Sequence, residues 1–288
     1  MALWNWTFRA GLAIAALGLV WTLWPAPGVR AWAIAYRGSR SRYHLGPRVS
    51  IDLGHFNDAP ADSRFLALGD LLIWDGYRVT RSKQYLVPEY LKEIRVLVIG
   101  NALPYPAGVG RLADAAGWSR ATFAPDEVRA VRDWVRAGGS LLLEADVPRS
   151  GQGAAPLANA LGLAFHDCPA PVFLPAVEAG QHPIRNGRSE YNERVDTVAA
   201  LAGGWIEALW PDAAAAALLT APPAAAGSCA AGKPLALALE FGRGRVVALS
   251  AQLERNEDLV RSTRVDPARF DNRQFILNVM HWLSRAGN

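Results

Sequence analysis

The segment that most constrains the fold is the apolar run "RVLVIG" at residues 95–100. It holds four consecutive apolar residues, Val96 to Ile99, and ends in a glycine. A strand that is apolar on both faces must be covered on both faces, which is typical of parallel sheets. Short apolar runs also alternate with amphipathic helical segments along the chain. We therefore predict an α/β fold with a largely parallel, doubly wound sheet.

Hydrophobic periodicity and stop signals predict the individual elements. We expect strands at 48–53, 77–80, 95–100 and 140–146, helices at 62–74, 88–93, 124–139, 154–161 and 271–285, and a C-terminal β-hairpin at 235–251. The last helix packs beside this hairpin in the expected fold. Segment 167–233 is rich in Pro and Ala, and we assign no secondary structure to it.

The first 33 residues have the layout of a signal peptide. A 15-residue apolar run, Ala10–Trp24, is followed by Pro25 and by the small-x-small triplet Ala31-Trp32-Ala33. We expect cleavage after Ala33 and a periplasmic or secreted protein. The alternative is an inner-membrane anchor formed by residues 4–24, which are about enough to span a bilayer. Residues 34–47 then form a flexible lead-in, and residues 48–288 form a single domain.

Composition and charge exclude some partners. After cleavage the chain carries 28 basic and 26 acidic residues, a formal charge of +2, and no basic stripe is interleaved with aromatic residues. We therefore expect no nucleic acid. No P-loop and no dinucleotide-binding glycine motif is present, and we expect no cofactor. In an oxidising compartment Cys168 and Cys229 can pair, and the sequence leaves that pairing open.

Polar side chains gather after the predicted strands, where open α/β sheets bind ligands. The segment "VSIDLGHFNDAP", 49–60, leads from the first strand into such a loop. The ligand-binding candidates are Asp52, His55, Asn57, Asn101, Asp146, His182 and Asn272. Other polar residues near these strand ends are Asp58, Glu144, Arg149, Gln252, Glu254 and Asp271.

Each candidate has a structural interpretation beside the functional one. His55 can be a general base, a metal ligand, or a loop histidine bonded to a backbone carbonyl. Asp52 and Asp146 can cap loop amides, and Asn272 can be a helix cap or a backbone tie. His182 can face a ligand or stabilise a turn. Asp52, His55 and His182 can converge on a metal, but their spacing does not require it, so we predict no metal.

Several ordered segments, taken together, resemble class I glutamine amidotransferase-like proteins. They are "IDLGHFND", "RVLVIGNALP", "FAPDEVRAVRDWVRAGGSLLLEAD", "HPIRNG", "FGRGRVVALSA" and "DNRQFILNVMHWL". The sequence is more similar to the exported bacterial branch of these proteins, a domain of unknown function with gliding-motility and ABC-transporter-associated relatives. A more distant similarity is to trehalose-utilisation-type proteins. The resemblance covers about 48–285 and implies a flavodoxin-like, amidotransferase-like sheet.

The resemblance does not extend to the nucleophile. Amidotransferases place a cysteine on the turn after the strand that corresponds to "SLLLEAD", and this chain has Asp146-Val147-Pro148 there. We therefore expect an envelope binding or accessory module that takes a small molecule, a glycan or an envelope protein. Trp205, Trp210 and Tyr191 would suit sugar stacking.

Two alternatives remain. One is a hydrolase acting on a carbohydrate or a related envelope substrate through Asp52, His55 and Asp146. The other is a membrane-tethered accessory subunit of a transporter.

Overall fold

The computed structural model describes residues 46–57, 63–105, 109, 112, 115–116, 122–146, 150–210, 215–223, 229–253 and 271–285. The predicted signal peptide or anchor at 1–33 lies outside these residues, as do Asp58, Arg149 and Glu254. Among the helices that are described, none has the length and apolarity needed to cross a bilayer.

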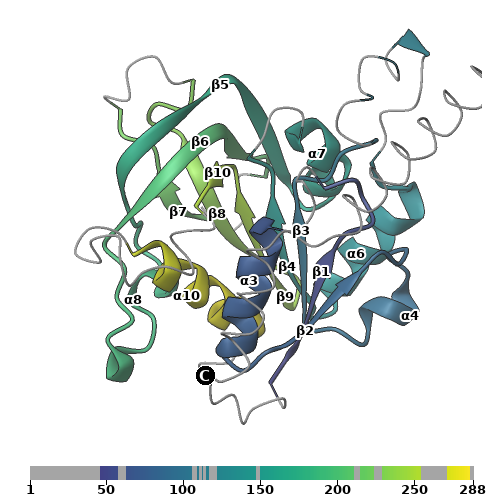
Figure 1. Cartoon of the computed structure of the whole chain (residues 1–288), viewed down its shortest axis with the longest axis horizontal. Helices are drawn as coiled ribbons and strands as arrows, with labels where there is room; N and C mark the ends of the chain where they lie inside the picture. The colour runs from purple at the N-terminus through teal and green to yellow at the C-terminus, as the bar shows by residue number, and fades with distance from the viewer. Residues whose placement is uncertain are drawn as a thin grey trace, which may run out of the picture. The chain divides into compact units, whose positions relative to one another are not determined.

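A seven-stranded sheet forms the centre of the domain, in the order β2-β1-β3-β4-β9-β8-β7 (Figure 1). Its first five strands are parallel, and β8 and β7 complete it in antiparallel pairing. The strands are β1 (Arg48–Asp52), β2 (Arg78–Ser82), β3 (Val96–Gly100), β4 (Ser140–Glu144), β7 (Ala215–Thr220), β8 (Pro234–Phe241) and β9 (Gly244–Leu249). The predicted fold class is confirmed, and so is the hairpin, whose second strand also pairs with β4.

Helices cover both faces of this sheet. They are α3 (Ser63–Trp74), α4 (Pro88–Leu91), α6 (Pro125–Arg136), α7 (Ser150–Ala160), α8 (Pro183–Asn186) and α10 (Asn272–Ser284). Alternate residues of β3 enter two separate cores. Val96 and Val98 pack with residues of α3 and α10, whereas Leu97 and Ile99 pack with residues of α6 and α7. The continuous apolar run is therefore explained by burial on both faces.

Strand order places a topological switch point at the centre of the sheet. The chain leaves β1 for β2 on one side and returns to β3 on the other side. In sheets of this kind the crevice beyond the carboxyl ends of the two central strands is where ligands bind. The loops that follow β1 and β3 are therefore the first place to look for a site.

A second, three-stranded antiparallel sheet was not predicted. It consists of β5 (Leu163–Glu178), β6 (Thr197–Ala208) and β10 (Ala251–Gln252). Prolines at 169, 171 and 175 remove backbone donors from β5, and its pairing with β6 shifts register twice in this region. These bulges break the strict alternation by which a strand is recognised in sequence.

Small residues let this second sheet approach the first one closely. A side chain at Gly203 of β6 would collide with the backbone carbonyl of Asp146, directly after β4. Glycine is required here because two backbones meet with no room for a Cβ atom. β6 therefore covers the exit of β4.

Cys168 and Cys229 form a disulfide between β5 and the turn that precedes β8. Their Cα atoms are 5.7 Å apart, and 61 positions separate them in sequence. The bond joins the second sheet to the main sheet. The pairing could not be decided from sequence, which contains no distance between the two residues.

We expect replacement of both cysteines by serine to lower the free energy of unfolding by about 2–4 kcal/mol, because a loop of this length retains much more freedom in the unfolded chain. Urea unfolding of the two proteins under oxidising conditions measures the difference. Dithiothreitol should lower the midpoint of the native protein and leave the double variant unchanged. Equal midpoints of the native protein with and without reductant would contradict the stabilising role.

Candidate functional site

Five of the seven candidate residues lie at the carboxyl ends of β1, β3 and β4. We call them the carboxyl-edge cluster: Asp52, His55, Asn57, Asn101 and Asp146. Strand topology brings them together, since the exits of neighbouring parallel strands share one edge. Their contacts show what each one does there.

His55 is held between two buried carboxylates. Its Nδ1 lies 2.8 Å from Oδ2 of Asp52, and its Nε2 lies 3.3 Å from Oε1 of Glu127. Only 8% of His55 is exposed, and both acids are buried more fully. Burial alone would lower the pKa of His55, but Asp52 and Glu127 outweigh it and raise that pKa above its usual value. The imidazolium form therefore donates from both nitrogens.

Both carboxylates also accept backbone hydrogen bonds. Asp52 accepts one from the amide of Gly54 at 2.9 Å. Glu127 accepts one from the amide of Leu86 and one from the amide of Ala124, each at 3.0 Å. The His55 triad, which we define as Asp52, His55 and Glu127, thus joins the β1 exit, the segment before α4 and the start of α6.

Asn101 and Asp146 form a reciprocal pair across the exits of β3 and β4. Nδ2 of Asn101 donates to Oδ1 of Asp146, and the amide of Asp146 donates to Oδ1 of Asn101, both at 2.9 Å. Asn101 adopts a left-handed backbone with φ of 50°. Asn57 joins the exits of β1 and β3, since its Nδ2 donates to the carbonyl of Gly100 at 2.6 Å. The cluster is therefore internally paired.

Phe56 is the strained member of the same loop. Its φ is 44°, a value that is rare for a bulky residue, and 48% of the residue is exposed. The neighbouring His55 is fixed by the triad, and Asn57 is fixed by Gly100. The loop consequently presents an aromatic ring to solvent at the switch point. Backbone strain of this kind concentrates at functional sites.

His182 and Asn272 do not join the carboxyl-edge cluster. His182 precedes α8, where its Nδ1 accepts a hydrogen bond from the amide of Ile184 at 3.2 Å. Asn272 bonds the amide and carbonyl of Ala199 on β6 and the carbonyl of Leu253. Each therefore fills the structural role considered for it, a turn for His182 and a backbone tie for Asn272. His182 contacts the rim of Trp282 and is not a third metal ligand beside Asp52 and His55.

Sequence reasoning missed Glu127 as a site residue. Its position in the first turn of α6 suggested only a favourable charge at the helix start. The signal that was present is a capping pattern, with Glu127 three residues after Ala124, and the structure forms the corresponding bond. Nothing in that pattern shows that the same carboxylate also reaches His55.

The three aromatic residues considered for sugar stacking do not form one surface. Trp205 is stacked on His166 at 3.8 Å and has Lys233 5.0 Å from its ring centroid. Trp210 follows the end of β6 and packs on Phe241, whereas Tyr191 precedes its start and lies beneath Arg188. A strand of this length separates Trp210 from Tyr191 by roughly 40 Å.

Within the described ranges, no group of three or more His, Cys, Asp and Glu residues is arranged to hold a metal ion. Both cysteines of the chain are in the disulfide, and neither follows β3 or β4. The turn that would carry an amidotransferase nucleophile is therefore not occupied by a thiol.

Comparison with solved structures shows the fold. The N-terminal domain of mmIFT52 aligns with a TM-score of 0.57 and 10% identity, over 82% of this chain and 97% of that one. A ThuA-like protein from Bacteroides uniformis aligns with a TM-score of 0.50 and 16% identity, over 87% of this chain and 98% of that one. A GMP synthase-like protein from Thermoplasma acidophilum reaches a TM-score of only 0.45, which is too low to carry an argument.

At the level of fold, these similarities support the resemblance to amidotransferase-like proteins. No protein-family model matches the sequence. No curated protein matches it either.

Replacing His55 by Gln should lower the free energy of unfolding by roughly 3 kcal/mol or more near pH 6, because two buried carboxylates lose their cation. Since the pKa of His55 is raised in the folded state, its stabilisation is complete below its usual value and is lost as pH rises through the folded value. Urea unfolding from about pH 6 to pH 9 should show the difference shrinking with pH.

The matched control is His166→Gln. His166 forms an exposed ion pair with Glu207, so its loss should cost less than about 1 kcal/mol. A His55→Gln difference that stays constant from acid to alkaline pH would show that the triad is not held by an imidazolium.

Proposed function

We propose that this chain is an exported envelope protein whose amidotransferase-like domain acts as a binding or accessory module and not as a hydrolase. The observation that carries the proposal is the pairing of His55. Both ring nitrogens face carboxylates, so the imidazole has no lone pair to offer as a general base. A hydrolase built on Asp52, His55 and Asp146 lacks its base in this arrangement.

The other acid of that hypothetical hydrolase is also engaged. Asp146 exchanges two hydrogen bonds with Asn101, on the exits of β3 and β4, whereas Asp52 is bonded to His55 on the exit of β1. These carboxylates shape the edge and leave its reactivity low. The pattern fits a module that presents a fixed surface.

Phe56 is the residue through which we propose that the module contacts its partner. The His55 triad and Asn57 fix the loop on both sides of Phe56, and the ring stands in solvent. An exposed aromatic ring held in place loses little conformational entropy when it is buried in a complex. We expect it to insert into an apolar pocket of an envelope protein.

Export is supported by two independent features. The first 33 residues have the pattern of a cleavable signal, and the only two cysteines of the chain pair in the folded domain. Disulfides form and persist outside the cytosol. The exported, amidotransferase-like branch is therefore the branch to which we assign this protein.

A photo-crosslinking phenylalanine analogue at position 56 of the full chain, expressed in the producing cell, should give one discrete adduct. The same analogue at position 173 is the control, because Phe173 is 53% exposed but lies on β5 in the second sheet. Phe56→Ala should abolish co-purification of the crosslinked protein and leave the free energy of unfolding within about 0.5 kcal/mol of the native value.

Equal adducts from positions 56 and 173 would remove Phe56 as the contact. Turnover of glutamine or of a chromogenic glycoside by the purified protein, abolished in Asp146→Asn, would replace the binding module by an enzyme.

Mass spectrometry of the protein recovered from the envelope should give a chain that begins at Ile34. Cleavage at this bond follows from Ala31 and Ala33 on the small-x-small rule. Ala33→Glu should slow cleavage, and Trp32→Phe should leave it unchanged. A native chain that still begins at Met1 would favour the tethered transporter subunit.

A further inference from the structure

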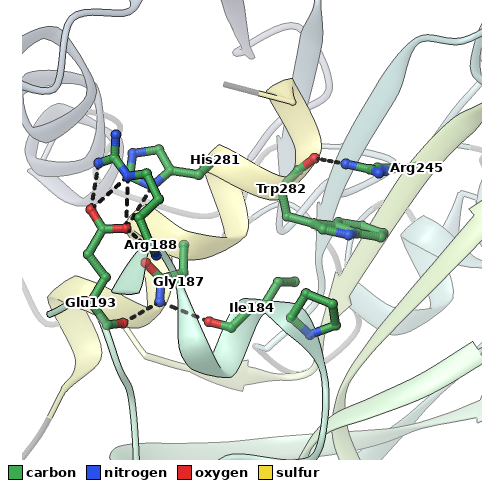
Figure 2. A pocket seen from close by; sticks show the side chains of 9 residues that line it. Ile184, Gly187, Arg188, Glu193, Arg245, His281 and Trp282 are labelled. Atoms are coloured by element: carbon green, nitrogen blue, oxygen red, sulfur yellow. Dashed lines mark hydrogen bonds and ion pairs between the residues drawn. The ribbon is translucent and has the colours of Figure 1, made fainter. Parts of the chain in front are cut away.

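A second pocket lies at the opposite edge of the main sheet, among the amino ends of its strands. It has a volume of about 300 Å³, at the lower end of the range for small-molecule sites. Arg245 contributes from the start of β9, Trp282 and His281 from the last turn of α10, and Arg188 and Glu193 from the segment after α8 (Figure 2). We call it the amino-edge pocket. The proposed binding of a partner at Phe56 does not involve it.

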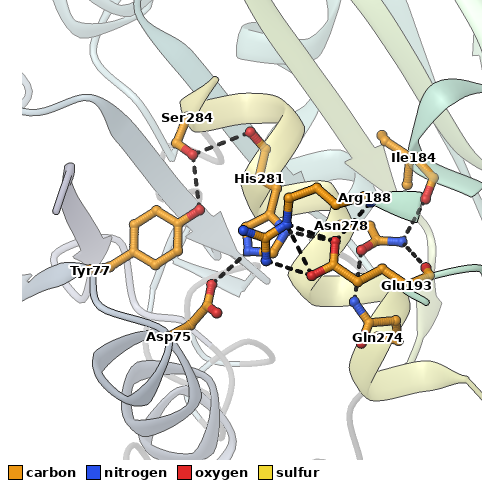
Figure 3. A network of polar contacts seen from close by, with 9 residues as sticks. All are labelled: Asp75, Tyr77, Ile184, Arg188, Glu193, Gln274, Asn278, His281 and Ser284. Atoms are coloured by element: carbon orange, nitrogen blue, oxygen red, sulfur yellow. Dashed lines mark hydrogen bonds and ion pairs between the residues drawn. The ribbon is translucent and has the colours of Figure 1, made fainter. Parts of the chain in front are cut away.

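One wall of this pocket is charged but self-neutral. Nε of Arg188 donates to both carboxylate oxygens of Glu193, at 3.0 and 3.1 Å. Behind them, Nε2 of His281 lies 2.7 Å from Oδ2 of Asp75 (Figure 3). The amide of Asn278 donates to the backbone carbonyls of Ile184 and Glu193. This wall is therefore rigid, and each of its cations already faces an acid.

The opposite wall carries positive charge that is poorly compensated. The side chain of Arg245 is 15% exposed, and its Nη1 donates to the carbonyl of Trp282 at 2.7 Å. Its nearest acid is Glu240, 3.5 Å from Nε and 64% exposed, and such an exposed partner contributes little. In the described part of the chain, Nε is buried and makes no hydrogen bond.

Like charges surround Arg245 as well. Burial lowers the pKa of Arg245, and the neighbouring Arg285 lowers it further. Arg95 responds in the same way to burial, to Arg285 and to Arg245. Three guanidinium groups thus share this corner, where Glu240 is the acid in contact. A buried charge of this kind is stabilised by any anion that reaches it.

The free edge of Arg245 favours a planar anion. Because Nη1 is used by the carbonyl of Trp282, Nε and Nη2 remain as the edge that can meet a carboxylate with two parallel bonds. Trp282, Pro183 and Ile184 supply apolar surface beside it. We propose that the amino-edge pocket binds a small organic carboxylate with a flat apolar body, its carboxylate paired with Arg245.

Calorimetric titration of the purified protein at low ionic strength tests this with three probes of one size. Benzoate should bind with a dissociation constant on the order of 1 mM. Benzamide keeps the ring without the charge and should bind at least about tenfold more weakly. Phenyl phosphate separates carboxylate from phosphate recognition, and we expect it to bind more weakly than benzoate.

Two substitutions locate the site. Arg245→Gln should weaken benzoate at least about tenfold. Glu240→Gln removes the acid that competes for the guanidinium and should tighten benzoate by about threefold, in a position too exposed for the fold to depend on it. Arg194→Gln, which affects an exposed pair with Asp196, is the matched control and should change nothing.

The outcomes are decisive in both directions. Tighter binding to Glu240→Gln with loss in Arg245→Gln supports the site even where Arg245→Gln lowers the melting temperature. Equal binding of benzamide and benzoate, or no effect of Glu240→Gln, overturns it. Stronger binding of phenyl phosphate overturns the carboxylate in favour of a phosphate ester. None of these results depends on the crosslink at Phe56.

Discussion

The imidazolium of His55 between Asp52 and Glu127 is the interaction on which the carboxyl edge depends. Three segments far apart in sequence meet there, and each of them contributes either a carboxylate or a backbone amide bonded to one. Two buried acids this close to one another would repel without the cation. With it, the exit of β1 becomes a fixed scaffold, and the strained backbone of Phe56 is tolerated because its neighbours cannot move.

The main sheet was predictable from local pattern, whereas the second sheet was not. "RVLVIG" and "SLLLE" are apolar on both faces, so their burial between two layers of helices follows from sequence. β5 carries three prolines and two register shifts, and β6 is built largely from Ala and Gly. Both strands owe their existence to pairing with each other, a non-local cause that no short window of sequence contains.

The candidate site was predictable in position and only in part in composition. Asp52, His55, Asn57, Asn101 and Asp146 share an edge because parallel strands end together, which strand order alone implies. His182 and Asn272 were grouped with them on residue type, and their bonds to Ile184 and to Ala199 show local structural work instead. Glu127 and Arg245 could not be found in this way, because burial of their charges is decided by tertiary contacts.

The meeting of Gly203 with the carbonyl of Asp146 sets the direction from which a partner can approach. Because β6 lies directly over the exit of β4, that flank of the edge is roofed by protein. The opposite flank, beyond β1, is where the Phe56 ring is exposed. A docking partner therefore enters from the side of β1 and meets the aromatic ring first, so that recognition at this edge is one-sided.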